Sequence, residues 1–258
     1  MFTTEKIANL LESTENGIPC VTVTGVREYD VAKTFDCGQC FRFDSVNSTA
    51  HEKEFSGVAH GRFVSFAQDG DTVLIYGSNM SDYENIWRRY LDIERDYAAI
   101  TEDILSNCPS EALRLSAEYG RGIRILSQDP FECIISFIIS QNNNIGRIKG
   151  IIQRLCENFG ENKGGYYTFP TAQKMATLTV EDLAPLRSGF RAKYLIDAAH
   201  KVANGEEDLY HLRYFTLEAA QQELMKIKGV GPKVADCTLL FALEHIEAFP
   251  KDVWIKRA

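Results

Sequence analysis

The chain has 258 residues, of which 45% are hydrophobic and 25% charged, which is the composition of a soluble globular protein long enough for two domains. No run of about 18 apolar residues is present, which excludes a membrane-spanning helix, and the first residues lack the basic start and apolar core of a signal peptide. A cytoplasmic location is therefore the default expectation. Seven cysteines, an odd number in mostly apolar segments, predict reduced thiols rather than a disulfide framework.

The net charge of −8 argues weakly against a nucleic-acid partner, but this charge is unevenly distributed. Residues 1–120 hold 10 Lys and Arg against 20 Asp and Glu, a sum of −10, whereas residues 121–258 hold 18 against 16, a sum of +2. Because a polyanion responds to the local field of one face, the second half remains a candidate for binding nucleic acid.

The first part of the chain has the pattern of β-structure. Apolar and polar residues alternate at 21–26, 61–66 and 72–77, and a turn sequence, Q-D-G-D, occupies 68–71. These segments predict an antiparallel sheet, followed by a helix near residues 82–97. No Gly-rich dinucleotide fingerprint and no internal repeat accompany them.

After about residue 120 the apolar residues recur with helical spacing. Asp129 and Pro130 begin a helix as N-cap and first residue, and residues 131–140 are apolar on nearly every side, which predicts a buried central helix. The helix after it is closed by Gly160. Its predicted apolar face comprises Ile145, Ile148, Ile151, Ile152, Leu155, Cys156 and Phe159. Further helical segments are predicted at 113–114, 194–202 and 217–225. The expected fold class is α+β, with a β-rich N-terminal domain over 1–117 and a helical domain over 118–258.

The segment K-I-K-G-V-G-P-K-V-A-D-C at 226–237 predicts a helical hairpin. A tight turn at 229–231 precedes Pro232, the first residue of the next helix. Two glycines allow close backbone approach, and a helix N-terminus favours a phosphate. A plain helix–turn–helix corner, with glycine serving the turn alone, is the alternative.

The helix from Pro232 carries Lys233, Cys237 and Phe241 along one stripe. A helix N-terminus and apolar surroundings both disfavour the lysine's charge, and a neutral amine is a nucleophile. A snorkelling surface lysine is the commoner alternative. Asp252, after a proline, fits an N-cap, and the hairpin geometry allows Lys233 and Asp252 to meet at the mouth of a cleft.

The sequence D-C-G-Q-C-F-R-F at 36–43 contains a C-x-x-C pair, Cys37 and Cys40. A zinc site needs a second ligand pair, and none is found at a suitable spacing. A redox dithiol prefers a helix N-terminus, whereas 36–43 has the pattern of a strand or its edge. Both cysteines are therefore interpreted as small packing residues.

Four segments in the same order resemble 8-oxoguanine DNA glycosylases, members of the superfamily defined by a helix–hairpin–helix, a Gly/Pro-rich loop and an aspartate. They are the C-G-Q-C-F-R-F motif at 37–43, the Q-D-P-F-E-C-I-I-S-F-I-I-S-Q-N-N-N stretch ending at 144, the G-F-R-A-K-Y motif at 189–194, and the hairpin followed by F-P-K-D-V-W. The lysine variant resembles the bifunctional glycosylase/AP lyases. The resemblance runs from about residue 18 to the end and implies a TBP-like N-terminal domain.

This resemblance implies the chemistry. Lys233 would attack the sugar anomeric carbon as a Schiff-base nucleophile, and Asp252 would orient the lysine and stabilise the positive charge that develops as the base departs. The imine would permit β-elimination of the 3′ phosphate. The DNA phosphate would lie on Gly229, Val230 and Gly231.

The resemblance also implies recognition residues for a flipped base. Gly38 would accept the N7–H that distinguishes 8-oxoguanine from guanine, while Cys237 and Phe241 would line the base pocket. Asn142, Arg147 and Arg191 would recognise the cytosine left behind, and Phe190 would be the wedge that fills the vacated stack. The implied partner is double-stranded DNA with 8-oxoguanine opposite cytosine, bound by a monomer in the bacterial cytoplasm at the nucleoid, or in the nucleus of a eukaryote.

The sequence departs from the family at several positions. Trp254 stands where some relatives have histidine, Phe190 where others have tyrosine, and Lys251 where an apolar residue is usual. Family members also continue for several tens of residues, whereas this chain stops six residues after Asp252. We therefore expect a fragment or an incomplete gene model, with reduced stability and activity.

No cofactor is expected beyond a possible monovalent or divalent cation at the hairpin, and the four-cysteine spacing of an iron–sulfur cluster is missing from the sequence. There are three alternatives. Lys233 argues against a glycosylase for alkylated purines, whose members usually lack the lysine, and the lack of a second ligand pair argues against a redox or zinc protein. The main alternative is a non-catalytic helix–hairpin–helix DNA-binding protein or inactive fragment.

Overall fold

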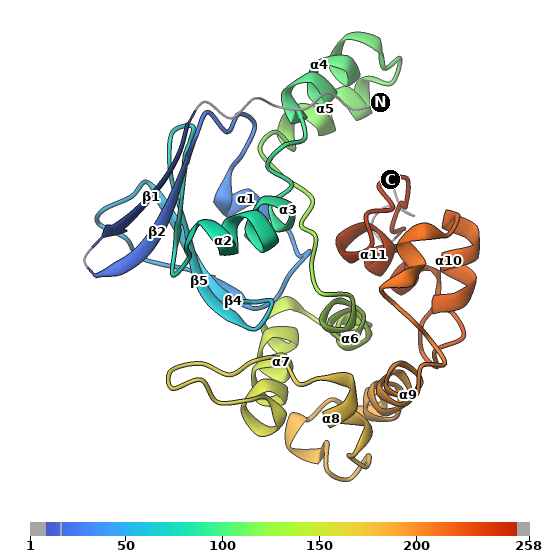
Figure 1. The fold of residues 1–258 in the computed structure, drawn as a ribbon. Helices are drawn as coiled ribbons and strands as arrows, with labels where there is room; N and C mark the ends of the chain where they lie inside the picture. The colour runs from blue at the N-terminus through green and yellow to red at the C-terminus, as the bar shows by residue number, and fades with distance from the viewer. Residues whose placement is uncertain (1–8, 16, 252–258) are drawn as a thin grey trace. The chain divides into compact units, whose positions relative to one another are not determined.

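The structure, a computed structural model, describes residues 9–15 and 17–251, which form two compact units (Figure 1). The second unit begins at Ser127 and also includes the short segments 40–42 and 60–62; the remaining described residues form the first unit. The chain leaves the first unit after Leu126, later than the boundary expected after residue 117.

The first unit is built on a β-sheet whose strands differ in length. Within the described residues this sheet has six strands in the order β1-β2-β6-β5-β4-β3, and the pairs β1–β2, β2–β6, β6–β5 and β3–β4 are antiparallel. The strands are β1 (Asn9–Glu15), β2 (Ile18–Thr24), β3 (Phe43–Ser45), β4 (Lys53–Ala59), β5 (Arg62–Asp69) and β6 (Thr72–Tyr76). The expected antiparallel sheet is confirmed.

Alternation along β2 and β6 fixes the register of the sheet. Val21 pairs with Ile75 and Val23 with Val73, and all four side chains are buried on one face because neighbouring residues of a strand point to opposite faces. The first strand, β1, was not predicted. Its side chains are half-buried or exposed, so its sequence carries little alternation.

Six helical segments complete the first unit: α1 (Val31–Asp36), α2 (Met80–Asp82), the π-helical η1 (Tyr83–Trp87), α3 (Arg88–Tyr90), α4 (Tyr97–Asn107) and α5 (Glu111–Tyr119), counted over the described part of the chain. Phe35 of α1 stacks on Phe66 of β5 at 5.1 Å and lies 6.4 Å from Tyr90 of α3, between ring centroids. Helices α1 and α3 therefore cover the same sheet face.

Two local expectations in this unit are wrong. The helix expected near 82–97 ends at Tyr90, because Asp92 takes a left-handed conformation with φ of 48° and a new helix begins only at Tyr97. The segment 36–43 is not a strand or its edge until Phe43: α1 ends at Asp36, and an irregular loop follows to the start of β3.

Arg124 explains why the chain stays with the first unit beyond α5. Its side chain is 0% exposed, and the guanidinium donates to the carbonyls of Arg27 (2.6 Å) and Asp92 (2.7 Å) while lying 4.6 Å from the ring centre of Tyr97. A buried guanidinium with these acceptors joins three separate segments of the unit. An arginine in an irregular stretch carries no sequence signal of such a role.

The second unit is helical. Over its described residues it comprises α6 (Pro130–Ser140), α7 (Ile145–Phe159), α8 (Ala172–Ala176), η2 (Ala184–Leu186), η3 (Gly189–Arg191), α9 (Ala192–Ala203), η4 (His211–Tyr214), α10 (Leu217–Leu224) and α11 (Pro232–Ala242). The helices predicted in this half are therefore confirmed, with α10 ending slightly earlier than expected. No helix in the described part of the chain is both long and apolar enough to cross a membrane.

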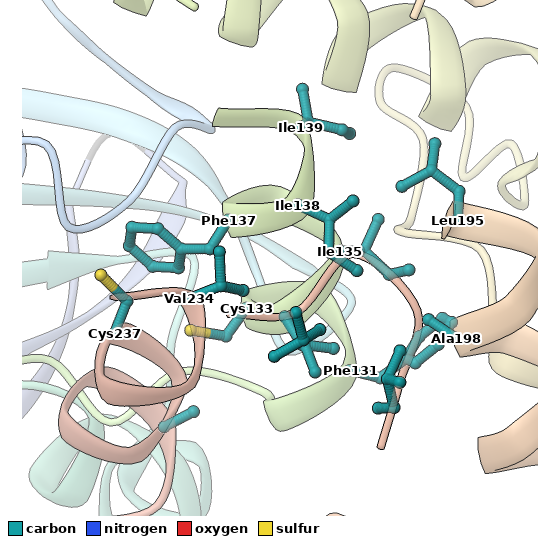
Figure 2. Close-up of a cluster of buried hydrophobic side chains, with 14 of the residues drawn as sticks. Phe131, Cys133, Ile135, Phe137, Ile138, Ile139, Leu195, Ala198, Val234 and Cys237 are labelled. Carbon is teal, nitrogen blue, oxygen red and sulfur yellow. The ribbon is translucent and has the colours of Figure 1, made fainter. Parts of the chain in front are cut away.

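The centre of this unit is α6, as its sequence predicted. Asp129 caps the helix by accepting from the backbone N–H groups of Phe131 (3.0 Å) and Glu132 (2.9 Å). Nine of its residues are buried, on all sides of the helix. Helices α7, α9 and α11 pack against it, and Figure 2 shows side chains of α6 among residues of α9 and α11.

Helix α7 presents the predicted apolar face to α6, with two qualifications. Ile145, at the first turn, is 48% exposed, so the buried face begins only at Ile148. Gly160 caps the helix with an extended backbone rather than a left-handed one. Its glycine is required for close approach: a Cβ there would lie 2.0 Å from the carbonyl oxygen of Thr168 and 2.6 Å from that of Cys156.

We expect Gly160→Ala to lower the free energy of unfolding by about 1–3 kcal/mol or more, since both atoms in the way belong to the backbone. Gly146→Ala in the same helix is the matched control, because its Cβ would have ordinary contacts only, the nearest at 3.7 Å. It should leave stability unchanged or raise it by up to about 1 kcal/mol. Urea denaturation of the two variants measures the difference, and equal stabilities would contradict the steric argument.

Candidate active site

The predicted helical hairpin is present between α10 and α11. Gly229 turns the chain with φ of 83°, and Pro232 is the first residue of α11. A Cβ on Gly229 would lie 2.4 Å from a ring carbon of Tyr194. Glycine is thus required here twice, for a left-handed backbone and for contact with an aromatic ring on α9.

The N-terminus of α11 differs from that of α6. Gly231 occupies the N-cap position, and among the described residues no side chain caps this helix. The first N–H groups of a helix have no intrahelical partner and lie at its positive end, so they favour an anion. Of the predicted phosphate ligands, Val230 uses its N–H within the turn, donating to Ile227 at 3.0 Å. Gly231 and the start of α11 are therefore the better placed donors.

Helix α9 holds the hairpin in place through a residue that the sequence did not single out. Asp197 accepts from the backbone N–H of Lys228 at 2.8 Å, and its other oxygen lies 3.2 Å from the Lys228 ammonium. Lys201, one turn further along α9, donates to the carbonyl of Lys226. Aspartates on the solvent-facing side of amphipathic helices are common, so the sequence does not distinguish Asp197 from them. Only the tertiary structure shows that this residue binds the hairpin.

The stripe of Lys233, Cys237 and Phe241 exists, but its members have different environments. Lys233 is exposed in the first turn, so the burial expected for its amine is not found. Cys237 is buried, and Phe241 is half-buried with its ring stacked on Phe137 of α6 at 5.7 Å. The exposed amine is therefore accessible to a ligand at the same helix end that favours an anion.

Figure 2 shows how the thiol of this stripe lies in the core of the unit. Cys133 of α6 and Cys237 of α11 belong to the same buried cluster, together with Phe137 and Val234. Burial raises the pKa of the Cys133 thiol well above its usual value, and the neighbouring Cys237 adds to the shift. All seven cysteines are free. Among the described residues, no group of three or more His, Cys, Asp and Glu side chains is placed to hold a metal ion.

Two of the predicted site residues are not among the described residues of the helical unit. Asp252 is outside the described residues, as is Trp254. Gly38 belongs to the first unit, in the loop after α1, with φ of 86° and nothing within 4 Å of an added Cβ. Glycine at this position is therefore required by the backbone conformation and not by a close neighbour.

The other four predicted residues come together around the C-terminal end of α6. Arg191, in η3, is 2% exposed, and its guanidinium donates to the backbone carbonyls of Gln141 (3.0 Å), Asn142 (3.0 Å) and Ser188 (3.1 Å). Asn142 is exposed and has a left-handed backbone, with φ of 46°. Arg191 thus fixes the chain where α6 ends and orients Asn142.

Phe190 and Arg147 form the exposed part of this cluster. Phe190 is 53% exposed, and the Arg191 guanidinium lies 4.5 Å from its ring centre. Arg147 is exposed on α7 and donates to the carbonyl of Arg187 at 3.2 Å. Burial lowers the pKa of Arg191, and the positive charge of Arg147 lowers it further. An exposed aromatic ring beside two cations suits a surface that receives a polyanion with stacked bases.

A cavity of about 300 Å³ lies at the other end of α6, between its N-terminus and α8. Glu132 and Asp129 contribute to its lining with Phe131, Phe169 and Tyr210. Burial raises the pKa of Glu132 to about 7, against the opposing charge of Arg42. None of the candidate residues lines this cavity, so it is separate from the candidate site.

Comparison with known proteins identifies the family. Residues 22–134 match the family model of the 8-oxoguanine DNA glycosylase N-terminal domain, and residues 135–258 match that of the HhH-GPD superfamily of base excision DNA repair proteins. The chain is similar to the structure of the Clostridium acetobutylicum 8-oxoguanine glycosylase/lyase in complex with double-stranded DNA containing cytosine opposite 8-oxoG. The TM-score is 0.88 and the identity 39%, over 97% of this chain and 84% of that one. This chain belongs to the 8-oxoguanine DNA glycosylase family.

Curated relatives carry names of the same family. The chain is 31% identical over 242 residues to the N-glycosylase/DNA lyase OGG1 of Arabidopsis thaliana, covering 88% of this chain and 65% of the relative. It is 39% identical over 153 residues to the N-glycosylase/DNA lyase of Saccharomyces cerevisiae, covering 53% and 41% respectively. The chain thus spans less than two thirds of the length of these relatives. The family resemblance and the α+β fold class expected from the motifs are confirmed.

We expect Arg191→Met to lower the free energy of unfolding by about 1.5–3 kcal/mol, because it leaves one buried and two partly buried carbonyls without a charged donor. Arg147→Met on the neighbouring helix is the control, since that exposed side chain makes one long hydrogen bond, and it should change stability by no more than about 0.5 kcal/mol. Urea denaturation checks both. Equal effects would show that Arg191 does not clamp the end of α6.

Proposed function

We propose that the protein is a bifunctional DNA glycosylase and AP lyase of base excision repair that removes 8-oxoguanine from double-stranded DNA. The observation that carries this proposal is the exposed amine of Lys233 in the first turn of α11, beside an N-terminus with no side-chain cap, in a chain of the 8-oxoguanine DNA glycosylase family. The names of the relatives and the DNA in the structure of the Clostridium protein support the same substrate.

In the proposed reaction, the Lys233 amine attacks the anomeric carbon of the damaged nucleotide, and the bond to the base breaks. Positive charge develops on the sugar as the base departs with the bonding electrons, and the carboxylate of Asp252 stabilises this charge. The departing base takes a proton from the lysine nitrogen, and the sugar ring then opens as the C1′–O4′ bond breaks, which converts the aminal into an imine. The imine acidifies the neighbouring carbon C2′, and loss of its proton to water expels the 3′ phosphate by β-elimination. The imine is then hydrolysed, which restores the lysine; no step requires a cofactor.

DNA binding is assigned to the hairpin and to the cluster around Arg191. A backbone phosphate would accept from the N–H of Gly231 and from those at the start of α11, at the positive end of this helix, because the Val230 N–H already donates to Ile227. Phe190 would enter the base stack as the damaged nucleotide leaves it, because its ring is exposed and apolar.

Recognition of the two bases is divided between different residues. Arg147 and Asn142 are exposed, so we assign most of the contact with the opposite cytosine to them, and Arg191 supports them through the backbone. Cys237 and Phe241 of the helical unit are assigned to the damaged base, and the recognition of this base by Gly38 stays a prediction. A cation at the hairpin, a monomeric state and the location in the cell stay predictions.

Borohydride trapping on a duplex with 8-oxoguanine opposite cytosine tests the lysine. Wild-type protein should form a covalent adduct, whereas Lys233→Gln should form none and still bind the duplex, because the hairpin is intact. Lys228→Gln, which removes an exposed lysine of the same hairpin, should retain the adduct at saturating protein. A protein that binds DNA without catalysis would form no adduct in any of the three forms, and this would refute the proposed reaction.

Opposite-base preference tests the assignment of Arg147. Wild-type protein should process 8-oxoguanine fastest opposite cytosine, and Arg147→Ala should reduce this preference by about 10-fold, since a good pair of hydrogen bonds to a base is worth about 1–3 kcal/mol. Lys193→Ala removes an exposed charge near the wedge. It should lower the rate of 8-oxoguanine processing by the same factor opposite all four bases. Single-turnover rates on four duplexes provide the comparison. Equal rates opposite all four bases in the wild type would contradict the assignment.

A further inference from the structure

Helix α9 contacts both parts of the proposed DNA-binding surface. Its first residue follows η3, which carries Phe190 and Arg191, and further along the helix Asp197 binds the hairpin at Lys228. Tyr194 lies between these two points of the helix. The residue is half-buried, and neither the sequence nor the proposed reaction assigns it a role.

The ring of Tyr194 contacts the hairpin with one face. A Cβ added to Gly229 would lie 2.4, 2.5 and 2.9 Å from Cγ, Cδ2 and Cδ1 of this ring. The ring therefore occupies the space that any other residue's side chain would need at the turn. Since Asp197 holds the adjacent residue Lys228 through both its backbone and its side chain, ring and turn keep a fixed relation.

The same ring contacts the wedge in an edge-to-face arrangement. The ring centroids of Tyr194 and Phe190 are 6.1 Å apart with an interplanar angle of 77°, a favourable geometry for two aromatic rings. The Arg191 guanidinium also contacts Phe190 and lies 4.5 Å from the centre of the Phe190 ring. Although 53% exposed, Phe190 thus has a defined orientation, set by two contacts.

We propose that Tyr194 is a positioning residue that couples the phosphate-binding hairpin to the Phe190 wedge. A phosphate bound at the turn holds Gly229 in place, Gly229 holds the Tyr194 ring, and the ring restricts Phe190 to the orientation in which it enters the base stack. A side chain ordered before binding loses less conformational freedom on insertion, so insertion becomes faster and more complete. The inference rests on the proposed function, which assigns the hairpin and the wedge to DNA.

The test measures wedge insertion separately from DNA affinity. The probe is a duplex with 8-oxoguanine opposite cytosine and 2-aminopurine as the adjacent base, whose fluorescence rises when stacking is lost. Tyr194→Leu should reduce the rate or extent of this rise by roughly 2- to 10-fold, the range expected for one aromatic pair. Tyr194→Phe keeps the ring and should behave as the wild type.

A double-mutant cycle shows whether Tyr194 acts through Phe190. Phe190→Leu alone should lower the fluorescence rise, and adding Tyr194→Leu to it should have no further effect. Affinity for an undamaged duplex should stay within about 2-fold of the wild type in Tyr194→Leu, because Tyr194 itself makes no phosphate contact in the proposed complex. If Tyr194→Leu lowers the melting temperature, Tyr194→Met replaces it in the cycle.

Each result that contradicts these expectations has a single interpretation. A normal fluorescence rise in Tyr194→Leu, with a reduced rise in Phe190→Leu, overturns the coupling and leaves the proposed function intact. Independent effects of the two substitutions also overturn it, as does an equal loss of affinity for undamaged DNA, since the ring would then merely support the hairpin. A normal rise in Phe190→Leu removes the wedge from the proposed function, and the coupling with it.

Discussion

The helical unit depends on the burial of α6. A helix that is apolar on all sides needs neighbours all round it, and α7, α9 and α11 supply them. The candidate residues described in this unit lie on these same helices and in the turns at their ends. Lys233 is the second residue of α11, Arg147 lies in α7, and Phe190 lies in η3, which immediately precedes α9. Core packing therefore fixes the places from which the polar and exposed groups extend, and rigid elements suit a site whose geometry must be exact.

Two glycine contacts show how closely the backbone elements approach one another in this unit. A Cβ added at Gly160 would meet a backbone carbonyl, so glycine at this position serves the packing of the unit. At Gly229 the neighbour is the Tyr194 ring, and the consequence extends to the proposed wedge. The two arginines of the cluster differ in the same way: Arg191 satisfies buried carbonyls, while Arg147 remains at the surface. Both arginines carry the same charge and have a similar sequence context, so the sequence does not show that their roles differ.

The C-x-x-C motif has a structural role that does not involve sulfur chemistry. Between its cysteines, Gln39 donates to the carbonyls of Thr34 (2.8 Å) and Arg124 (2.9 Å) and accepts from the N–H of Leu126 (3.0 Å). Phe41 packs edge-on against Phe137 at 5.7 Å in the second unit. Cys40 is buried, which fits the expected packing role, whereas Cys37 is exposed at the end of α1 and does not fill a core position. Gly38, between the two cysteines, has a left-handed backbone with φ of 86°.

The sequence by itself determined the fold class, the central helix, the hairpin and the family, because each depends on local patterns: alternation in β2 and β6, the Asp129-Pro130 start of α6, and the glycines before Pro232. The grouping of Asn142, Arg147, Phe190 and Arg191 was implied by the resemblance to the glycosylase family. Only the tertiary structure decided that Lys233 is exposed, that Arg191 is buried against carbonyls, and that Arg124, Asp197 and Tyr194 join separate segments. These features depend on which residues meet across long distances in the chain, and a single polar or aromatic residue has no periodicity from which its partner could be inferred.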